Sequence, residues 1–236
     1  MKKDLSWLTE RPIAHRGLHD QNKAVWENTS TAFRRAIEHG YAIECDLQYV
    51  SDGRPVVFHD DDLERLCNIK GDVRLMTSGE LGLLSIGGTA DKIPTLRQLL
   101  SLTAGRVPLV IELKGREHDD DGFADAVLET LESYDGAVAL MSFDVWLLKD
   151  LKGLDCRWPV GLTAEGVKPV DFVKHREAMS LGLDFISYNV MHLPNEFIAS
   201  ERSRMIPIIT WTVTNEALAA HTYAHANQIT FEGFLP

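Results

Sequence analysis

Eight short apolar segments recur along this chain, and stretches with helical periodicity separate them. Several are nearly continuous in apolar residues, which is typical of parallel strands that are buried on both faces. Strands that alternate with helices indicate βα units and a parallel sheet. The predicted strands are Pro12–Ala14, Ala42–Val50, Val107–Leu113, Val138–Phe143, Pro159–Thr163, Phe185–Val190, Ile206–Val213 and Gln228–Phe231.

The helical segments are amphipathic, and the first has clear boundaries. Ser30–His39 follows Asn28 and Thr29, which suit a helix cap, and it ends at Gly40. Because no Pro/Gly/Ser-rich linker divides the eight units, we predict one (β/α)8 TIM barrel domain over residues 1–236 rather than an open doubly wound sheet. The other predicted helices are Thr95–Thr103, Gly122–Tyr134, Asp144–Lys152, Val170–Leu181, Pro194–Glu201 and Asn215–Ala224.

One segment departs from this alternation. Pro55–His59 has the character of an additional short strand that follows Asp52-Gly53. An Asp-Gly pair between two alternating runs is a strong hairpin signal. We therefore expect a hairpin arm formed by Leu47–Val50 and Pro55–His59 above the second strand. A short, irregular insertion over about residues 61–92 would follow it.

Two carboxylates interrupt the second predicted strand. Because strand side chains alternate, Glu44 and Asp46 share a face, whereas Ile43, Cys45 and Leu47 would point outward beneath the helices. Two carboxylates that point into a barrel repel each other and are costly to desolvate without a cation. Oxygen-rich ligation suits Mg²⁺ or Ca²⁺. The pair indicates a cation site, with a solvated strand end that binds nothing as the alternative.

A third carboxylate, Glu112, lies near the end of the third predicted strand and would complete this cation site. Lys114 shares the face of Glu112 and would supply a positive charge for a phosphoryl group. The alternative is a Glu–Lys pair that only stabilises the barrel mouth.

The first predicted strand ends in His15-Arg16-Gly17. This position places both side chains at the C-terminal mouth, where barrel enzymes keep their active sites. Arg16 offers a planar fork that suits phosphate oxygens, and His15 can move a proton.

A second histidine is expected beside the carboxylates. If Asp52-Gly53 is a two-residue loop, the hairpin register places His59 directly opposite Asp46, with Cβ atoms about 5 Å apart. A histidine next to a carboxylate is a credible proton donor near neutral pH. A surface histidine without a function is the alternative.

Three further positions at the mouth or beside it carry weaker signals. Trp211 would form an apolar wall for a substrate or would simply pack in the core. Glu232 follows the last strand and has no forced role. His19 has no pattern that distinguishes it from a surface residue, and Glu27 and Asn28 most simply begin a helix.

The ordered set of motifs resembles the glycerophosphodiester phosphodiesterase family, from about Ile13 to Gly233. Two departures from the family pattern are Trp26, where proline is common, and Glu232-Gly233, where Thr-Asp is more frequent. The motifs are His15-Arg16-Gly17, Glu27-Asn28-Thr29, Glu44-x-Asp46, Asp52-Gly53, Val56-Val57-Phe58-His59-Asp60, Pro94-Thr95-Leu96, Ile111-Glu112-Leu113-Lys114 and Trp211-Thr212-Val213.

The resemblance implies a TIM barrel with a small insertion, and hydrolysis of glycerophosphodiesters to glycerol 3-phosphate and an alcohol. It implies that His15 and His59 form the general acid/base pair, and that Arg16 and Lys114 bind phosphate oxygens. The implied ligands of one Mg²⁺ or Ca²⁺ ion are Glu44, Asp46 and Glu112.

Two other functions remain open at this point. One is a lysophospholipase-D-like or cyclising phospholipase activity on the same barrel. The other is a non-catalytic binding barrel that keeps the cation only for stability, although such a site needs neither histidine.

Charge and cysteine content restrict the partners. Asp and Glu number 35 against 24 Lys and Arg, which gives a net charge of −11. An acidic protein is a poor partner for nucleic acid or anionic membrane surfaces, so we expect a small-molecule substrate and no stable membrane association. Three widely spaced cysteines and the lack of an apolar leader favour a reducing cytoplasm.

Overall fold

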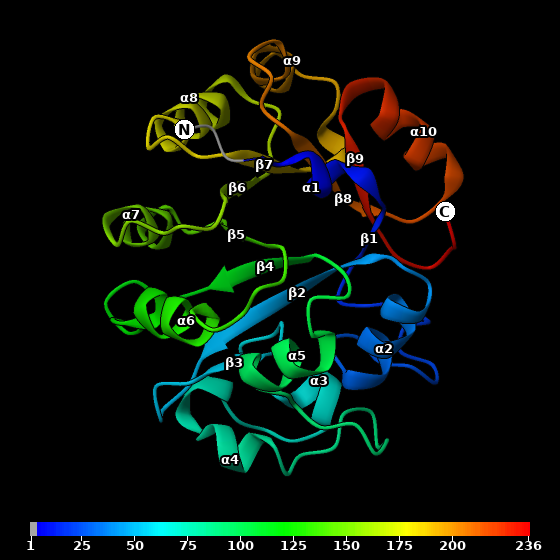
Figure 1. Ribbon diagram of the computed structural model, residues 1–236, viewed down its shortest axis with the longest axis vertical. Helices are drawn as coiled ribbons and strands as arrows, with labels where there is room; N and C mark the ends of the chain where they lie inside the picture. Colours follow the sequence, from blue (N-terminus) through cyan, green and yellow to red (C-terminus); the bar gives the residue numbers. More distant parts are fainter. Residues whose placement is uncertain (1–3) are drawn as a thin grey trace.

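A computed structural model describes residues 4–236 and contains a closed barrel of eight parallel strands (Figure 1). The first strand, β1, pairs with both β2 and β9, which closes the sheet and confirms the predicted TIM barrel. The barrel strands are β1 (Ile13–Ala14), β2 (Ala42–Tyr49), β4 (Leu109–Lys114), β5 (Val138–Ser142), β6 (Val160–Ala164), β7 (Phe185–Asn189), β8 (Ile208–Val213) and β9 (Gln228–Phe231).

Seven helices surround the barrel, each close to its predicted position. The N-terminus of α2 is capped by Thr29, whose side chain accepts a hydrogen bond from the backbone N–H of Ala32. In residues 4–236, no helix combines the length and the apolar character that crossing a membrane requires. The surrounding helices are α2 (Ser30–Glu38), α5 (Leu96–Thr103), α6 (Phe123–Leu131), α7 (Val145–Gly153), α8 (Pro169–Met179), α9 (Glu196–Ser203) and α10 (Glu216–His225).

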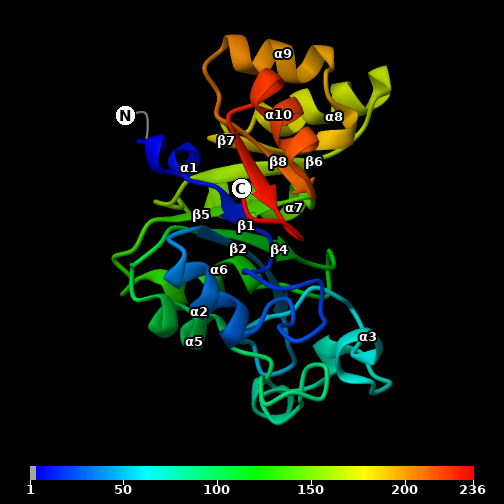
Figure 2. The ribbon, with the colours of Figure 1, turned by 90° about the vertical axis from the view of Figure 1, so that its right-hand side faces the viewer.

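Strand alternation separates two apolar layers. Ile43, Cys45 and Leu47 of β2 belong to the layer between strands and helices, as predicted from their alternation with the carboxylates. A second layer fills the N-terminal end of the barrel, where Leu5 and Leu8 pack against inward side chains of the strands. Leu8 lies in α1 (Ser6–Glu10), a helix that the sequence analysis did not predict and that lies across this end (Figures 1 and 2). Because apolar side chains fill the N-terminal end of the barrel, only its C-terminal end can hold a cluster of polar side chains.

The hairpin forms, but its predicted register is wrong by one residue. Tyr49 pairs with Pro55 of the antiparallel strand β3 (Pro55–Val57), so residues 50–54 connect the strands instead of two residues. Asp46 therefore lies level with Phe58, whose backbone N–H donates to the Asp46 carbonyl at 3.0 Å. Within this loop, the Asp52 carboxylate accepts hydrogen bonds from Ser78 at 2.7 and 3.1 Å, which ties the turn to the insertion.

The insertion after β3 is more ordered than predicted. It contains α3 (Glu64–Cys67), the 3₁₀ helix η1 (Val73–Leu75) and α4 (Ser78–Leu81), and it forms a small core of its own beside the barrel. This core joins hairpin residues to insertion residues. Its buried members are Val50, Val56, Phe58, Leu63, Leu66, Val73, Leu81, Ile86 and Ile93.

Trp26, the residue that departs from the family pattern, helps to anchor this insertion. Its indole ring lies against the backbone of Gly87, where an added Cβ would fall 1.9 Å from the ring atom Cε2. The loop between β1 and α2 is thus packed against the insertion, and both segments border the barrel mouth.

Candidate active site

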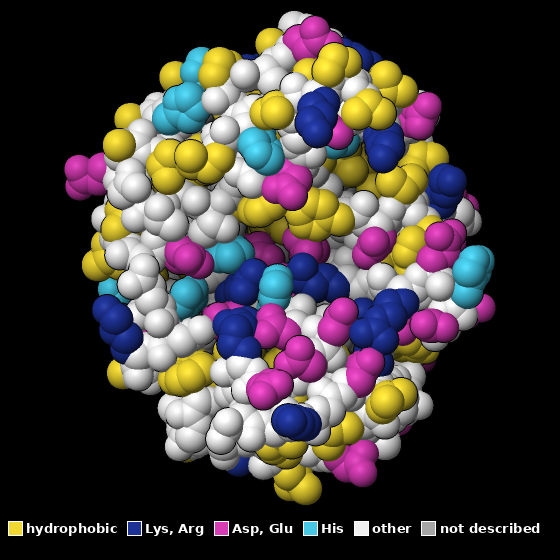
Figure 3. Space-filling model, turned by 180° about the vertical axis from the view of Figure 1, so that it is seen from behind, with side chains coloured by type: hydrophobic (Ala, Val, Ile, Leu, Met, Phe, Trp, Pro, Cys, Tyr) yellow, Lys and Arg dark blue, Asp and Glu magenta, His cyan; other side chains and the backbone are white. Residues whose placement is uncertain are grey.

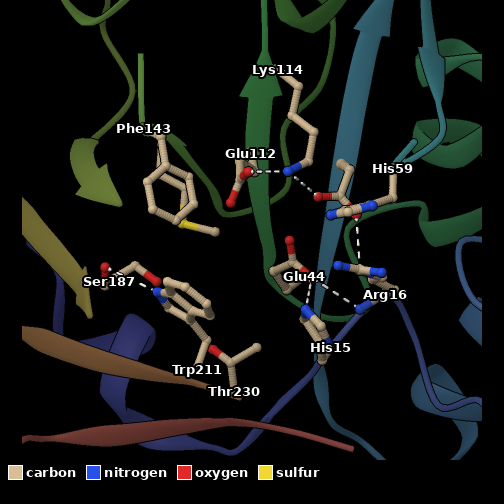
Figure 4. A pocket seen from close by; sticks show the side chains of 12 residues that line it. His15, Arg16, Glu44, His59, Glu112, Lys114, Phe143, Ser187, Trp211 and Thr230 are labelled. Carbon is tan, nitrogen blue, oxygen red and sulfur yellow. Dashed lines mark hydrogen bonds and ion pairs between the residues drawn. The ribbon is translucent and has the colours of Figure 1, made fainter. Parts of the chain in front are cut away.

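The C-terminal end of the barrel is hollowed, and charged side chains gather around the hollow (Figure 3). The pocket at this end has a volume of about 70 Å³. Arg16, His59 and Lys114 lie on one side of it, while Phe143 and Trp211 lie on the other (Figure 4). All eight predicted site residues line this one pocket, because the carboxyl ends of parallel strands meet at the same edge.

Three buried carboxylates form the floor on the charged side. Glu44 and Asp46 come from β2, and Asp46 is in register with Glu112 on the neighbouring strand β4. The exposed fractions of the three residues are 2%, 2% and 6%, and their potential ligand oxygens lie within 4.8 Å of one another. A converging set of buried oxygen donors fits Mg²⁺ or Ca²⁺.

Burial and neighbouring charges shift the pKa values of these three carboxyl groups. Burial, followed by the charges of Asp46 and Glu112, raises the pKa of Glu44 well above its usual value. Burial also raises the pKa of Glu112 to about 7, although Lys114 opposes this rise. Burial would raise the pKa of Asp46 as well, but the charges of Arg16 and Lys114 outweigh it and lower that pKa. A divalent cation would relieve the repulsion within the cluster.

Two cationic side chains form ion pairs with these carboxylates. The Lys114 Nζ atom is 2.6 Å from Glu112 Oε1 and 3.4 Å from Asp46 Oδ1. The Arg16 Nε atom is 3.2 Å from Asp46 Oδ2, and the Arg16 backbone N–H donates to Glu44 at 2.9 Å. Both cations face the pocket beside the carboxylates (Figure 4).

The backbone around Arg16 is constrained by the close approach of α2. Arg16 has a φ of +53°, and Gly17 follows it with a φ of +79°. A Cβ on Gly17 would lie 2.9 Å from the Cβ of Ala32, so a larger residue would push the mouth away from α2.

Glu27 and Asn28 support the site, a role that no local sequence pattern indicated. The Arg16 Nη1 atom donates to Glu27 at 2.7 Å, and Arg65 of the insertion donates to both oxygens of Glu27 at 2.8 Å. Burial would raise the pKa of Glu27, but the hydrogen bonds and charges of the two arginines lower it to about 2. Asn28 donates from Nδ2 to Asp46 at 2.9 Å. The only sequence signal was their place in the family motif.

In both histidines, the Nδ1 atom of the ring contacts a carboxylate. The Nδ1 atom of His15 is 2.7 Å from Glu232 Oε2, and the Nδ1 atom of His59 is 2.7 Å from Asp60 Oδ1. The Nε2 atom of His15 lies 3.9 Å from Glu44. Burial lowers the pKa of both imidazoles below its usual value, although the neighbouring carboxylates oppose this change. His59 reaches the pocket from just beyond the end of β3, despite the different register.

Glu232 and His19 are further polar groups near the mouth that the sequence did not single out. Glu232 follows β9 directly, and the hydrogen bond from His15 lowers its pKa. His19 is buried, with its Nε2 atom 3.5 Å from Glu232 Oε2. The position of Glu232 after a strand was a usable signal, but His19 lies in a loop whose path only the fold determines.

The opposite wall is aromatic and carries two hydroxyl groups. Phe143 and Trp211 form an edge-to-face pair with ring centroids 5.4 Å apart. The indole N–H of Trp211 donates to the carbonyl of Ser187 at 3.3 Å. The hydroxyls of Ser187 and Thr230 line the pocket, are buried, and have no hydrogen-bond partner within residues 4–236.

Comparison with known proteins agrees with this arrangement. Residues 15–232 match the model of the glycerophosphoryl diester phosphodiesterase family. A glycerophosphodiester phosphodiesterase of Caldanaerobacter subterraneus is 30% identical over 85% of this chain and 84% of its own length. A putative glycerophosphodiester phosphodiesterase of Bacillus subtilis is 30% identical over 90% of this chain and 89% of its own length. The names of these relatives describe enzymes of one hydrolase family, which does not support the alternative of a non-catalytic barrel.

Solved structures show the same fold. An Oleispira antarctica phosphodiesterase in complex with the product sn-glycerol-3-phosphate has a TM-score of 0.85 and 23% identity, and the match covers 96% of this chain and 94% of that one. A Thermotoga maritima glycerophosphodiester phosphodiesterase has a TM-score of 0.75 and 27% identity, with 94% of each chain covered. This chain belongs to the glycerophosphoryl diester phosphodiesterase family and is a phosphoric diester hydrolase.

Proposed function

We propose that this hydrolase cleaves small glycerophosphodiesters to glycerol 3-phosphate and an alcohol, with one Mg²⁺ or Ca²⁺ ion held by Glu44, Asp46 and Glu112. The observation that carries the proposal is that two histidines, His15 and His59, line the same pocket as this carboxylate cluster. The product bound to the Oleispira relative supports the same product class. We further propose that residues 1–236 act as one domain.

The charged side of the pocket would bind the phosphodiester. Arg16 and Lys114 present cationic groups to the pocket beside the carboxylates. Their N–H donors would hold phosphate oxygens and orient the phosphorus between the histidines. A bound divalent cation would supply further neutralisation of the phosphate charge.

The two histidines would move the protons of the reaction. One imidazole accepts the proton of the nucleophile, which is either water or the 2-hydroxyl of the glycerol moiety. The oxygen of that nucleophile forms the new bond to phosphorus, and the bond from phosphorus to the alcohol oxygen breaks. The other histidine, in its protonated imidazolium form, donates a proton to the leaving alkoxide and is left neutral. In the hydroxyl route, water then opens a cyclic phosphate, so the overall reaction remains a hydrolysis.

The aromatic side would hold the glycerol moiety. Trp211 and Phe143 offer an apolar wall for its carbon atoms. The unpartnered hydroxyls of Ser187 and Thr230 would bind its hydroxyl groups, because buried polar groups need hydrogen-bond partners. The leaving alcohol would then lie toward solvent.

One observation favours a second candidate substrate, a lysophospholipid cleaved by a lysophospholipase-D-like or cyclising reaction. Exposed apolar side chains follow three consecutive barrel strands, namely Phe143 after β5, Val167 after β6 and Met191 after β7, with exposed fractions of 41%, 59% and 69%. Such a rim would shelter an acyl chain. Comparison of lysophosphatidylcholine with glycerophosphocholine as substrates separates the two candidates.

A cytoplasmic location is also part of the proposal. The structure contains free thiols at Cys45 and Cys67. Free thiols are compatible with a reducing compartment.

The test is an assay of glycerol 3-phosphate release from glycerophosphocholine and glycerophosphoethanolamine with Mg²⁺, with Ca²⁺ and with EDTA. We expect metal-dependent release that falls at least about 100-fold in His15→Ala and in His59→Ala. His39→Ala, which alters an exposed histidine at the end of α2, is the control and should retain activity. Folded, metal-loaded protein that cleaves no glycerophosphodiester would refute the proposal.

A further inference from the structure

The contact between His15 and Glu232 determines where the imidazole carries its proton. An ionised carboxylate only accepts hydrogen bonds, so the 2.7 Å contact from His15 Nδ1 to Glu232 Oε2 requires a proton on Nδ1. The Nε2 atom of the neutral ring then has a free lone pair. That atom is the one that lies 3.9 Å from Glu44.

His19 faces the same carboxylate from another direction. Its Nδ1 atom accepts a 3.1 Å hydrogen bond from the backbone N–H of Gln21, so Nδ1 cannot carry a proton. The proton of the neutral ring therefore lies on Nε2, which is 3.5 Å from Glu232 Oε2. This distance is long for a hydrogen bond, but the His19 side chain is only 5% exposed, so the electrostatic attraction is weakly screened.

The proton positions argue against a second metal site in this group. His15, His19 and Glu232 present ligand-type atoms within 4.8 Å of one another. A histidine binds a metal through an unprotonated nitrogen. Because the Nδ1 atom of His19 is occupied by the Gln21 N–H, its Nε2 atom keeps its proton and points a donor, rather than a lone pair, at the group.

The carboxylates behind the two catalytic histidines have different surroundings. Asp60, behind His59, receives hydrogen bonds from Arg65 Nε at 2.7 Å and Arg65 Nη2 at 2.8 Å. Within residues 4–236, the basic side chains that the structure records beside Glu232 are the imidazoles of His15 and His19, and none is a lysine or an arginine. The negative charge of Glu232 is therefore directed at His15 without a permanent cation to neutralise it.

We propose that Glu232 and His19 are positioning residues that hold His15 in the Nδ1–H tautomer with its Nε2 lone pair directed into the active site. Glu232 accepts a hydrogen bond from the Nδ1–H group of His15, and His19 directs its Nε2–H group at the Glu232 carboxylate. The function of this arrangement rests on the proposed role of His15 in proton transfer. The arrangement itself is a property of the folded protein and is testable without turnover.

The first test compares substitutions at Glu232 in the full-length, metal-loaded enzyme. Glu232→Gln keeps the size of the side chain but removes its charge, and it should lower kcat for glycerophosphocholine by about 10- to 100-fold with little change in KM. Glu232→Asp restores the charge and should recover a large part of kcat. An unchanged kcat in Glu232→Gln would overturn the proposal, as would equal losses in kcat for both variants.

The role of His19 is tested by a pair of variants that differ in their ability to donate a hydrogen bond. His19→Gln retains an N–H donor and should keep kcat near the wild-type value, whereas His19→Phe removes the donor and should lower kcat by about tenfold. Equal kcat values in the two variants would remove His19 from the proposal. Glu165→Gln is the control for the loss of a mouth carboxylate, because Glu165 contacts Asn189 on the far side of the barrel.

A direct measurement of the tautomer separates this inference from the proposed function. Long-range ¹H–¹⁵N NMR spectra of ¹⁵N-histidine-labelled protein should show His15 protonated at Nδ1 and His19 protonated at Nε2, with His15→Ala providing the assignment. A His15 ring protonated at Nε2 would overturn the inference even in an active enzyme. If the wild-type protein cleaved no glycerophosphodiester, the proposed function would fail, whereas the spectra would still decide the role of Glu232.

Discussion

Asn28 donates a hydrogen bond from Nδ2 to Oδ2 of Asp46 at 2.9 Å, and both side chains are buried. Such a bond orients a carboxylate for metal binding. We expect Asn28→Ala to weaken Mg²⁺ or Ca²⁺ binding by about 10- to 100-fold, measured by calorimetric titration. Asn189→Ala, which removes a hydrogen bond to Glu165 at the rim, is the matched control. Equal affinities in the two variants would contradict this role for Asn28.

The effect of the metal on stability should depend on pH. Burial raises the pKa of Glu112 from 4.5 to about 7, so the folded metal-free protein binds an additional proton between these values. The binding of this proton stabilises the folded state at low pH. The stabilisation is lost as the pH rises toward 7, because the Glu112 carboxyl of the unfolded chain ionises at a lower pH than that of the folded protein. A cation binds the ionised carboxylate and competes with that proton.

We therefore expect Mg²⁺ to raise Tm more at about pH 8 than at about pH 5.5, as measured by scanning calorimetry. Glu112→Gln should reduce this difference, because it removes the titrating group. The same rise in Tm at both pH values in the wild-type protein would show that Glu112 does not titrate in this range.

The hydroxyls on the aromatic side should determine preference for glycerol. We expect Ser187→Ala and Thr230→Val to lower kcat/KM for glycerophosphocholine by about tenfold, with a smaller change for bis(4-nitrophenyl) phosphate, which lacks glycerol. Thr163→Val is the matched control, because Thr163 is also buried with an unpartnered hydroxyl but does not line the pocket. Parallel losses for both substrates would indicate a structural role.

The contact between Trp26 and Gly87 should contribute to stability. Gly87→Ala would place a Cβ inside the Trp26 ring, at 1.9 Å from Cε2, and would strain a φ of +59°. We expect a loss of roughly 1–3 kcal/mol in the free energy of unfolding, measured with urea. Gly88→Ala has a similar φ of +69° but meets nothing within 4 Å, so it measures the backbone strain alone. Equal losses would exclude a packing role for Trp26.

The hairpin illustrates where local sequence rules fail. Asp52-Gly53 correctly predicted a turn, but residues 50–54 form the connection, and Asp52 in it accepts hydrogen bonds from Ser78 of the insertion. Asp52 and Ser78 are 26 residues apart, so the sequence around the turn does not indicate this contact. His59 nevertheless lines the pocket, since the chain passes the mouth just after β3.

The amino-acid sequence by itself determined the alternation of strands and helices, and with it the barrel and the inward direction of Glu44 and Asp46. These features follow from local periodicity, which each segment carries within its own residues. Only the tertiary structure decided that Glu27 would join Arg16 to Arg65, and that His19 and Glu232 would meet behind His15. Those contacts join loops that are distant in sequence, and their geometry arises from closure of the barrel rather than from any local pattern.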